Sequence, residues 1–441
     1  MSGIAEILTD FAQAPCRADA TAREVMRLSL LDWAAVGLAG ANEPVARHLR
    51  AQALEERGAG QAGLIGSATR VPARMAALVN GATSHALDYD DTHFAHIGHP
   101  SVAVVPAALA AAQLAGADGT AFQTACLIGA EASIRVGIWL GRSHYQAGFH
   151  QTGTAGAFGA ALAAGRLLGL EPGQMQMALG LVSTRASGLK AQFGSMGKPL
   201  NAGFAAQNGV EAALLAARGV QSMPAALDGP RGFGPTHHGA AEVAGFDRLG
   251  GHWLFTGVRH KFHACCHGLH AALEALAGLH AAPREIASIE VRTNPRWLSV
   301  CDIAAPRTGL EAKFSYKVAL AMALCGMQTG RLESFTDATC QEPEVEALRR
   351  RISVRGDPDL GEMQARLLVA SHDGTRQELF HDLDADPGLA ARRDRVRAKA
   401  AGLIGADRAA RLWEIVQGAG APDTLAAELT GQSAASSSAS A

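Results

Sequence analysis

The chain has 441 residues, of which 48% are hydrophobic and only 5% aromatic, and its formal net charge is −2. This length exceeds one ordinary core and predicts two or three domains. The near-neutral charge provides no basic field to attract phosphates, so nucleic acid is excluded as an expected partner. Because the hydrophobic residues are mostly Ala, Leu and Val and 50 residues are Gly, the composition predicts closely packed helices.

The cysteines and the N-terminus indicate the compartment. Seven cysteines are an odd number in a long chain, and they show no CxxC spacing, so we expect reduced thiols and a cytoplasmic protein. No basic region precedes an apolar core at the N-terminus, and no signal peptide is therefore expected. The most apolar run, residues 101–117, is interrupted by Pro106 and Gln113, so we expect no membrane span.

Helical periodicity dominates the first part of the chain. It begins at residues 21–38, and after a polar linker through Arg57 it resumes near Val71. Further predicted helices cover residues 120–140, 152–168, 173–181 and 202–217. Each of them is bounded by Gly, Pro or a polar cap. This part of the sequence predicts an all-helical domain that covers residues 1–261.

The pattern changes after residue 261. The sequence IASIEVRTN from Ile286 alternates as a strand does, and residues 365–380 read as a hairpin with Asp373-Gly374 in the turn. We therefore predict a smaller α/β domain at 262–398, with residues 399–432 returning to complete the helical domain. The predicted fold class is mainly α, with an all-helical large domain and a smaller α/β domain. The Ser/Ala-rich tail, 433–441, is expected to be disordered.

The stretch HALDYDDTHFAHIGHP, residues 85–100, places three aspartates and four histidines between two alanine-rich apolar segments. Titratable groups crowded into an apolar setting are frequent at functional sites. The spacing of His93, His96 and His99 is compatible with a zinc or iron site completed by an aspartate. Because no HExxH motif or thiolate pair accompanies them, we predict no metal, and expect most of these groups to cap helices or orient neighbours.

Three other segments carry candidate functional residues. His150 precedes a predicted helix whose first N–H groups attract carboxylates, so it is a candidate general base, although a structural histidine is the alternative. Lys198 lies in a Gly-rich loop and is expected to meet an anion, unless it is a surface lysine. Lys261 and Cys266 lie at the predicted domain junction, where ligand sites are common. Cys266 follows another cysteine, and a buried inert thiol is expected there rather than a nucleophile.

The chain shows neither a GxGxxG motif after a strand nor a P-loop, so we predict no nucleotide. Taken in order, the segments HALDYDDTH, HYQAGFHQTG, GSMGKPLNAGFAAQNG and HKFHACCHGLH resemble the MmgE/PrpD family, as does EAKFSYKVALAMAL after them. This resemblance spans nearly the whole chain. It implies a helical domain built from both chain ends, an α/β lid domain, a homodimer and no cofactor.

Family members include 2-methylcitrate dehydratase, cis-aconitate decarboxylase and iminodisuccinate epimerase. Their activities share proton transfer at a carbon next to a carboxylate, which requires a site that holds a polyanion. By this resemblance, the catalytic residues are expected to be His150, His99, Lys198 and Asp88. The substrate-binding residues are expected to be Thr92, Lys261, Cys266 and Tyr316.

Two departures from the family pattern bear on the reaction. Where many relatives read FSxxY, this chain has Val318 in place of the tyrosine, and Tyr316 is out of register. Cys266 stands where the decarboxylases carry a histidine. Both departures weaken the decarboxylase assignment. The expected function is a dehydratase-type lyase that acts on a small di- or tricarboxylate, with an epimerase, a decarboxylase and a non-catalytic binding protein as the alternatives.

The proton transfer itself has two possible assignments. In the first hypothesis, His150 is the general base, while Lys198 and Lys261 hold the carboxylates of the substrate. In the rival hypothesis, His99 is the base, oriented by Asp88, and His150 donates to the leaving hydroxyl.

Overall fold

The computed structural model describes residues 3–223, 225–240, 242–385 and 387–431. It divides into two compact units. We call residues 1–260 with 396–441 the helical unit, and residues 261–395 the sheet unit. The predicted fold class, mainly α with a smaller α/β part, is confirmed. The predicted disordered tail, 433–441, lies outside the described residues.

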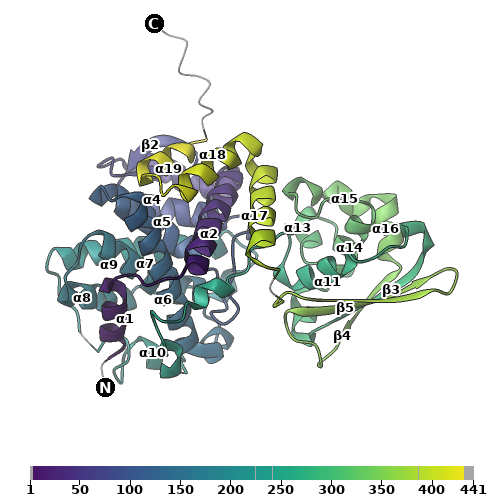
Figure 1. Cartoon of the computed structure of the whole chain (residues 1–441), viewed down its shortest axis with the longest axis horizontal. Coiled ribbons are helices and arrows are strands. Elements are labelled where there is room, and N and C mark those ends of the chain that lie inside the picture. Colours follow the sequence, from purple (N-terminus) through teal and green to yellow (C-terminus); the bar gives the residue numbers. More distant parts are fainter. Residues whose placement is uncertain (1–2, 224, 241, 386, 432–441) are drawn as a thin grey trace, which may run out of the picture. The chain divides into compact units, whose positions relative to one another are not determined.

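The helical unit is formed by helices from both ends of the chain (Figure 1). Its helices before the sheet unit are α1 (Ile4–Gln13), α2 (Ala20–Ala39), α3 (Pro44–Glu56), α4 (Ala73–His85), α5 (Ser101–Ala115), α6 (Gly119–Gln146), α7 (Gln151–Leu167), α8 (Pro172–Ser183), α9 (Gly197–Ala217) and α10 (Phe233–Thr236). After the sheet unit come the part of α17 (Leu389–Ile404) from Val396 onward, α18 (Ala406–Gln417) and α19 (Pro422–Glu428).

Glycines allow the central helices to approach closely. A Cβ atom on Gly81 of α4 would lie 2.9 Å from the Cα of Gly203 in α9. A Cβ atom on Gly129 of α6 would lie 2.6 Å from the carbonyl oxygen of Gly159 in α7. No side chain fits at such distances, so the backbones themselves are in contact. This packing fixes the ends of α4, α7 and α9, and these ends carry the candidate site.

The segment before α4 differs from its prediction. The prediction of a polar linker through Arg57 is wrong, because helix α3 occupies most of this segment. This helix buries Val45, Ala46 and Ala53. Most of α3 is exposed, so its apolar stripe is too narrow to read from periodicity. A short antiparallel hairpin follows, formed by β1 (Ala62–Leu64) and β2 (Ser67–Val71).

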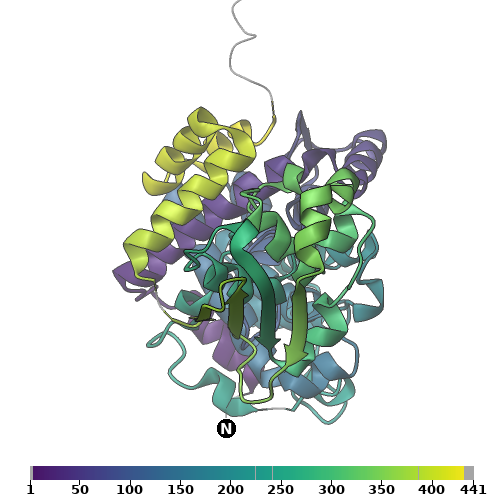
Figure 2. The ribbon, with the colours of Figure 1, turned by 90° about the vertical axis from the view of Figure 1, so that its right-hand side faces the viewer.

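The sheet unit contains a four-stranded mixed sheet in the order β4-β3-β5-β6 (Figure 2). Its strands are β3 (Ile286–Thr293), β4 (Ile352–Gly356), β5 (Gln364–Ser371) and β6 (Arg376–Asp382). The predicted strand at Ile286 and the predicted hairpin of β5 and β6 are confirmed, with Gly374 in the turn at φ 89°. Strand β4, which pairs parallel to β3, was not predicted, because ISVRG is short and half exposed.

Helices of the sheet unit are short. They are α11 (His270–Leu276), α12 (Leu298–Cys301), α13 (Gly309–Ala312), α14 (Tyr316–Leu324), α15 (Asp337–Gln341) and α16 (Pro343–Arg349). Helix α11 contacts β5 and β6, and α14 contacts β4. Alternate residues of the central strands, including Val291, Leu367 and Val369, are buried. The core of this unit therefore lies between the sheet and these helices.

One described helix, α6, is long and apolar enough to cross a membrane, but 83% of its most apolar window is buried inside the protein. The apolar side chains of α6 are covered by other parts of the protein, as in a core helix.

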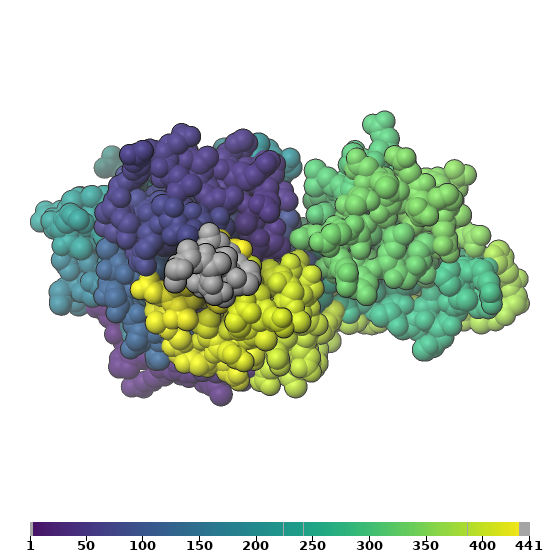
Figure 3. Space-filling model, turned by 90° about the horizontal axis from the view of Figure 1, so that it is seen from above, coloured from purple at the N-terminus to yellow at the C-terminus, as the bar shows by residue number. Residues whose placement is uncertain are grey.

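A buried ion pair joins the two ends of the chain within the helical unit. Lys399 Nζ of α17 lies 2.6 Å from Asp32 Oδ1 of α2, and both side chains are at most 3% exposed. The same ammonium donates to the carbonyl oxygen of Tyr89 at 2.6 Å. Figure 3 shows the surface of the C-terminal segment, in yellow, beside that of the N-terminal part of the chain, in purple. Lys399 therefore ties the returning segment to α2 and to the loop after α4.

We expect Lys399→Met to lower the free energy of unfolding by roughly 3–5 kcal/mol, because it leaves the buried Asp32 carboxylate without its cation. Urea denaturation followed by circular dichroism measures this loss. The double variant Lys399→Met with Asp32→Leu serves as the control, and it should recover most of the loss since no charge is left buried. A single variant as stable as the wild type would contradict the prediction.

Candidate active site

The loop between α4 and α5, residues 86–100, carries most of the candidate site. The predicted arrangement, a polar loop between two buried helices, is confirmed. Ser101 is the first residue of α5, and its own side chain does not cap this helix. Asp91 does so instead, accepting hydrogen bonds from Ser101 Oγ at 2.6 Å and Ser101 N at 3.3 Å. Burial raises the pKa of Asp91 to about 7, although the bond from Ser101 opposes this shift.

Asp88 is the most exposed acidic group of the loop. Its φ of 51° is in the left-handed region, which Asp tolerates better than most residues. Its Oδ1 lies 2.6 Å from Lys198 Nζ and 3.4 Å from His99 Nε2. The Asp88 and Lys198 side chains are 34% and 17% exposed, so solvent reaches the site at this pair.

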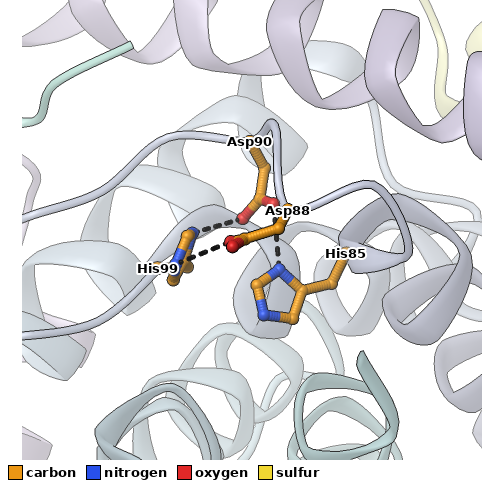
Figure 4. A group of neighbouring side chains, drawn as sticks. All are labelled: His85, Asp88, Asp90 and His99. Atoms are coloured by element: carbon orange, nitrogen blue, oxygen red, sulfur yellow. Dashed lines mark hydrogen bonds and ion pairs between the residues drawn. The ribbon is translucent and has the colours of Figure 1, made fainter. Parts of the chain in front are cut away.

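Asp90, two residues after Asp88, is fully buried. Its Oδ1 is 2.9 Å from His85 Nδ1, and its Oδ2 is 2.8 Å from His99 Nδ1 (Figure 4). Burial alone would raise the pKa of this carboxyl, but the two imidazoles outweigh burial and hold the pKa well below its usual range. Asp90 is therefore an ionised carboxylate that can only accept hydrogen bonds.

His150 is the N-cap residue of α7, as the sequence predicted for a histidine just before a helix. It is 2% exposed, and its Nδ1 lies 3.0 Å from Asn201 Nδ2 of α9. Burial, with smaller effects from the charges of His85 and Lys198, lowers the pKa of His150 well below its usual range. Its imidazole is therefore neutral at physiological pH.

His85 connects the two sides of the site. Its ring centroid is 4.6 Å from that of His99 and 6.1 Å from that of His150. The prediction that Lys198 lies in a loop is wrong, since it belongs to the first turn of α9. The structure thus brings together four predicted catalytic residues, Asp88, His99, His150 and Lys198.

The remaining predicted site residues are Thr92, Lys261, Cys266 and Tyr316. Thr92 follows Asp88 by four residues and pairs through its backbone with Arg259. Lys261, Cys266 and Tyr316 belong to the sheet unit. Lys261 is 2% exposed there. The Tyr316 hydroxyl donates to the Gly268 carbonyl at 2.6 Å, a contact inside the sheet unit that gives this tyrosine a structural role.

His93 and His96 serve the structure of the loop, as expected for most of its polar groups. His93 Nε2 donates to the Leu254 carbonyl at 3.0 Å, and His96 Nε2 lies 3.3 Å from Ser133 Oγ. Burial lowers the pKa of His93 to about 4 and that of His96 to about 3. Among the residues that the structure describes, the group whose ligand atoms could hold a metal is instead His85, Asp88, Asp90 and His99.

Two members of this group, His85 and Asp90, were not predicted as site residues. His85 is the last residue of the apolar helix α4, and Asp90 follows five residues later. A buried polar residue at the end of an apolar helix could have indicated that His85 has a buried partner. Sequence spacing gave no indication that one carboxylate meets two imidazoles, because His99 approaches from the other end of the loop.

Comparison with known proteins places the whole fold in one family. Residues 6–244 match the model of the MmgE/PrpD N-terminal domain, and residues 263–417 match the model of the MmgE/PrpD C-terminal domain. These two matches together cover most of the chain and include every predicted site residue except Lys261.

Several individual proteins are similar to the chain. A cis-aconitate decarboxylase of Aspergillus terreus is 29% identical over 358 residues, which are 74% of this chain and 72% of that enzyme. The cis-aconitate decarboxylase-like protein oryM of Aspergillus oryzae is 33% identical over 57% of this chain and 55% of its own length. The cis-aconitate decarboxylase of Homo sapiens is 34% identical over 37% of this chain and 35% of that enzyme.

We expect the activity of the purified protein to survive EDTA, with no stoichiometric zinc or iron. The cation at Asp88 is already supplied by Lys198 at 2.6 Å, and both Nδ1 atoms of His85 and His99 face Asp90. Metal analysis by plasma mass spectrometry, run in parallel with the assay, tests this. One metal atom per chain that is lost together with activity would show the prediction to be wrong.

Proposed function

The chain belongs to the MmgE/PrpD family, and from this membership we propose that it is a cofactor-independent lyase that acts on a small di- or tricarboxylate. In this proposal, a proton moves at a carbon next to a carboxylate. The observation that carries it is the meeting of Lys198 with His99 around Asp88, beside the neutral His150. One cation and two imidazoles are what such a reaction requires.

The binding of a carboxylate is supported by three positive features on one side of the site. Lys198 contributes its ammonium group, and it lies in the first turn of α9. His150 precedes the first turn of α7, a second long helix whose N-terminus also carries partial positive charge. A polyanion that enters beside the exposed Asp88 would meet Lys198 first. Its carboxylate then competes with Asp88 for the same ammonium.

Dehydration is the first candidate reaction. One group removes the proton next to the carboxylate, and a second gives a proton to the hydroxyl that leaves as water. His99 and His150 are the two imidazoles available for these steps in the helical unit. Lys198 stabilises the enolate-like charge that develops between them, because its ammonium stands at the carboxylate end of the site.

Decarboxylation is the second candidate, and the names of the similar Aspergillus and human proteins favour it. The carbon–carboxylate bond breaks, CO₂ leaves, and the electron pair moves to a carbon that then takes a proton. This reaction needs an acid but no base. His99, whose two nitrogens face two carboxylates, is suited to carry the required proton.

The reaction type is tested by incubating the purified protein in D₂O with 2-methylcitrate, citrate, cis-aconitate and iminodisuccinate, followed by NMR. We expect dehydration of a hydroxy tricarboxylate. Loss of CO₂ from cis-aconitate with one deuterium incorporated would establish the second candidate instead. Deuterium exchange without net conversion would indicate an epimerase. If the protein neither converts any of the four compounds nor exchanges their protons, the proposed function is contradicted.

We expect Lys198→Met to lower kcat/KM by about 10²–10³-fold, the usual effect of removing one group that stabilises developing negative charge. Steady-state kinetics on the substrate identified by NMR measures it. Lys190→Met is the matched control, because Lys190 is a lysine eight residues earlier whose Nζ donates to the Tyr145 carbonyl rather than meeting Asp88. Equal losses in the two variants would contradict a specific role for Lys198.

A further inference from the structure

The partner of each Nδ1 atom decides where the protons of the site histidines lie. A neutral imidazole carries one proton, and it is found on the nitrogen that faces an acceptor. An ionised carboxylate only accepts hydrogen bonds, whereas the nitrogen of an amide only donates them. The site contains both kinds of partner, one on each side.

Asp90 is the acceptor. Its two oxygens lie 2.9 Å from His85 Nδ1 and 2.8 Å from His99 Nδ1, and the carboxylate is buried and ionised. Both Nδ1 atoms therefore carry a proton. His99 Nε2 faces Asp88 Oδ1 at 3.4 Å, which favours a second proton on that ring. Because Asp90 retains the Nδ1 proton, only the Nε2 proton of His99 is able to leave.

Asn201 is the donor. Its Nδ2 lies 3.0 Å from His150 Nδ1 and 3.4 Å from the carbonyl oxygen of Leu189, so two acceptors face this amide nitrogen. Asn201 is 6% exposed and His150 is 2% exposed, so water does not substitute for either contact. His150 Nδ1 therefore accepts a hydrogen bond, and its single proton lies on Nε2.

We propose that Asp90 and Asn201 are positioning residues that fix opposite tautomers on the two sides of the site. Asp90 holds His85 and His99 with a proton on Nδ1, and Asn201 holds His150 with its proton on Nε2. The catalytic meaning of this arrangement rests on the proposed function.

The consequence is a division of roles between the two imidazoles. His99 exchanges a proton with the substrate through Nε2, passing between the doubly protonated ring and the neutral Nδ1–H form. His150 remains neutral and donates a hydrogen bond from Nε2 to a substrate oxygen, as a neutral imidazole does when it stabilises negative charge. These roles are the reverse of the hypothesis that made His150 the base.

The tautomers are measured directly by NMR of the substrate-free protein labelled with ¹⁵N-histidine. Long-range ¹H–¹⁵N correlations distinguish the two ring nitrogens, and His→Gln variants assign the signals. We expect Nε2–H for His150 and a protonated Nδ1 for His85 and His99. The inference would be overturned if His150 carried its proton on Nδ1, or if Nδ1 of His99 carried none. This test requires no substitution of Asp90 or Asn201.

Asn201→Asp tests the donor side, because a carboxylate only accepts and should shift the His150 proton to Nδ1. We expect kcat to fall by about 10²-fold with KM changed less than threefold, as for a lost transition-state interaction. The matched control is Asn208→Asp on the same helix. Asn208 is also 6% exposed and its Nδ2 donates to the Arg185 carbonyl, so this variant should keep the His150 tautomer.

Asp90→Asn tests the acceptor side, and it should reduce Nδ1 protonation at His85 and His99. Asp91→Asn changes the neighbouring buried aspartate, which bonds Ser101 instead, and should leave both rings unchanged. A tautomer shift in Asn201→Asp with wild-type kcat would refute the catalytic role. Since the NMR measurement needs no substrate, absence of lyase activity would contradict the proposed function alone, and reversed tautomers in an active enzyme would contradict this inference alone.

Discussion

The buried charge of Asp90 is the constraint on which the site depends. An ionised carboxylate held away from water costs several kcal/mol unless its oxygens are satisfied. Asp90 meets this requirement with two imidazoles, one from the last turn of α4 and one from the end of the loop before α5. The loop at 86–100 must therefore fold back on itself, and the left-handed backbone of Asp88 provides one of the bends. The charge thus determines the shape of the loop.

The helices around this loop carry the other groups of the site at their N-terminal ends. His150 and Lys198 are at the N-terminal ends of α7 and α9, and both helices are packed through glycines at backbone contact distance. Such packing has little freedom to adjust, because no side chain separates the backbones. The positions of the imidazole and the ammonium are therefore set by the core of the helical unit rather than by flexible loops.

The sequence predicts features that depend on local pattern, and misses those that depend on distant partners. Fold class, the central loop, the helix after His150 and the hairpin at Asp373-Gly374 all follow from periodicity and turn chemistry. Helix α3 was missed because its buried stripe is narrow, and β4 because it is short. The partner of His150 is 51 residues away in the sequence, and no spacing rule indicates that an amide would meet it.

The site consequently has a fixed layer and an exchangeable one. Asp90 and Asn201 are buried, and each contacts its imidazole at 3.0 Å or less. Asp88 is about one third exposed, and it shares a single oxygen between Lys198 and His99. Under the proposed function, a substrate carboxylate takes the place of that oxygen beside Lys198 and His99, and the buried layer is undisturbed. Under the same proposal, Asp88 marks the position of the substrate carboxylate, because one anion would replace another there without changing the charge balance of the site.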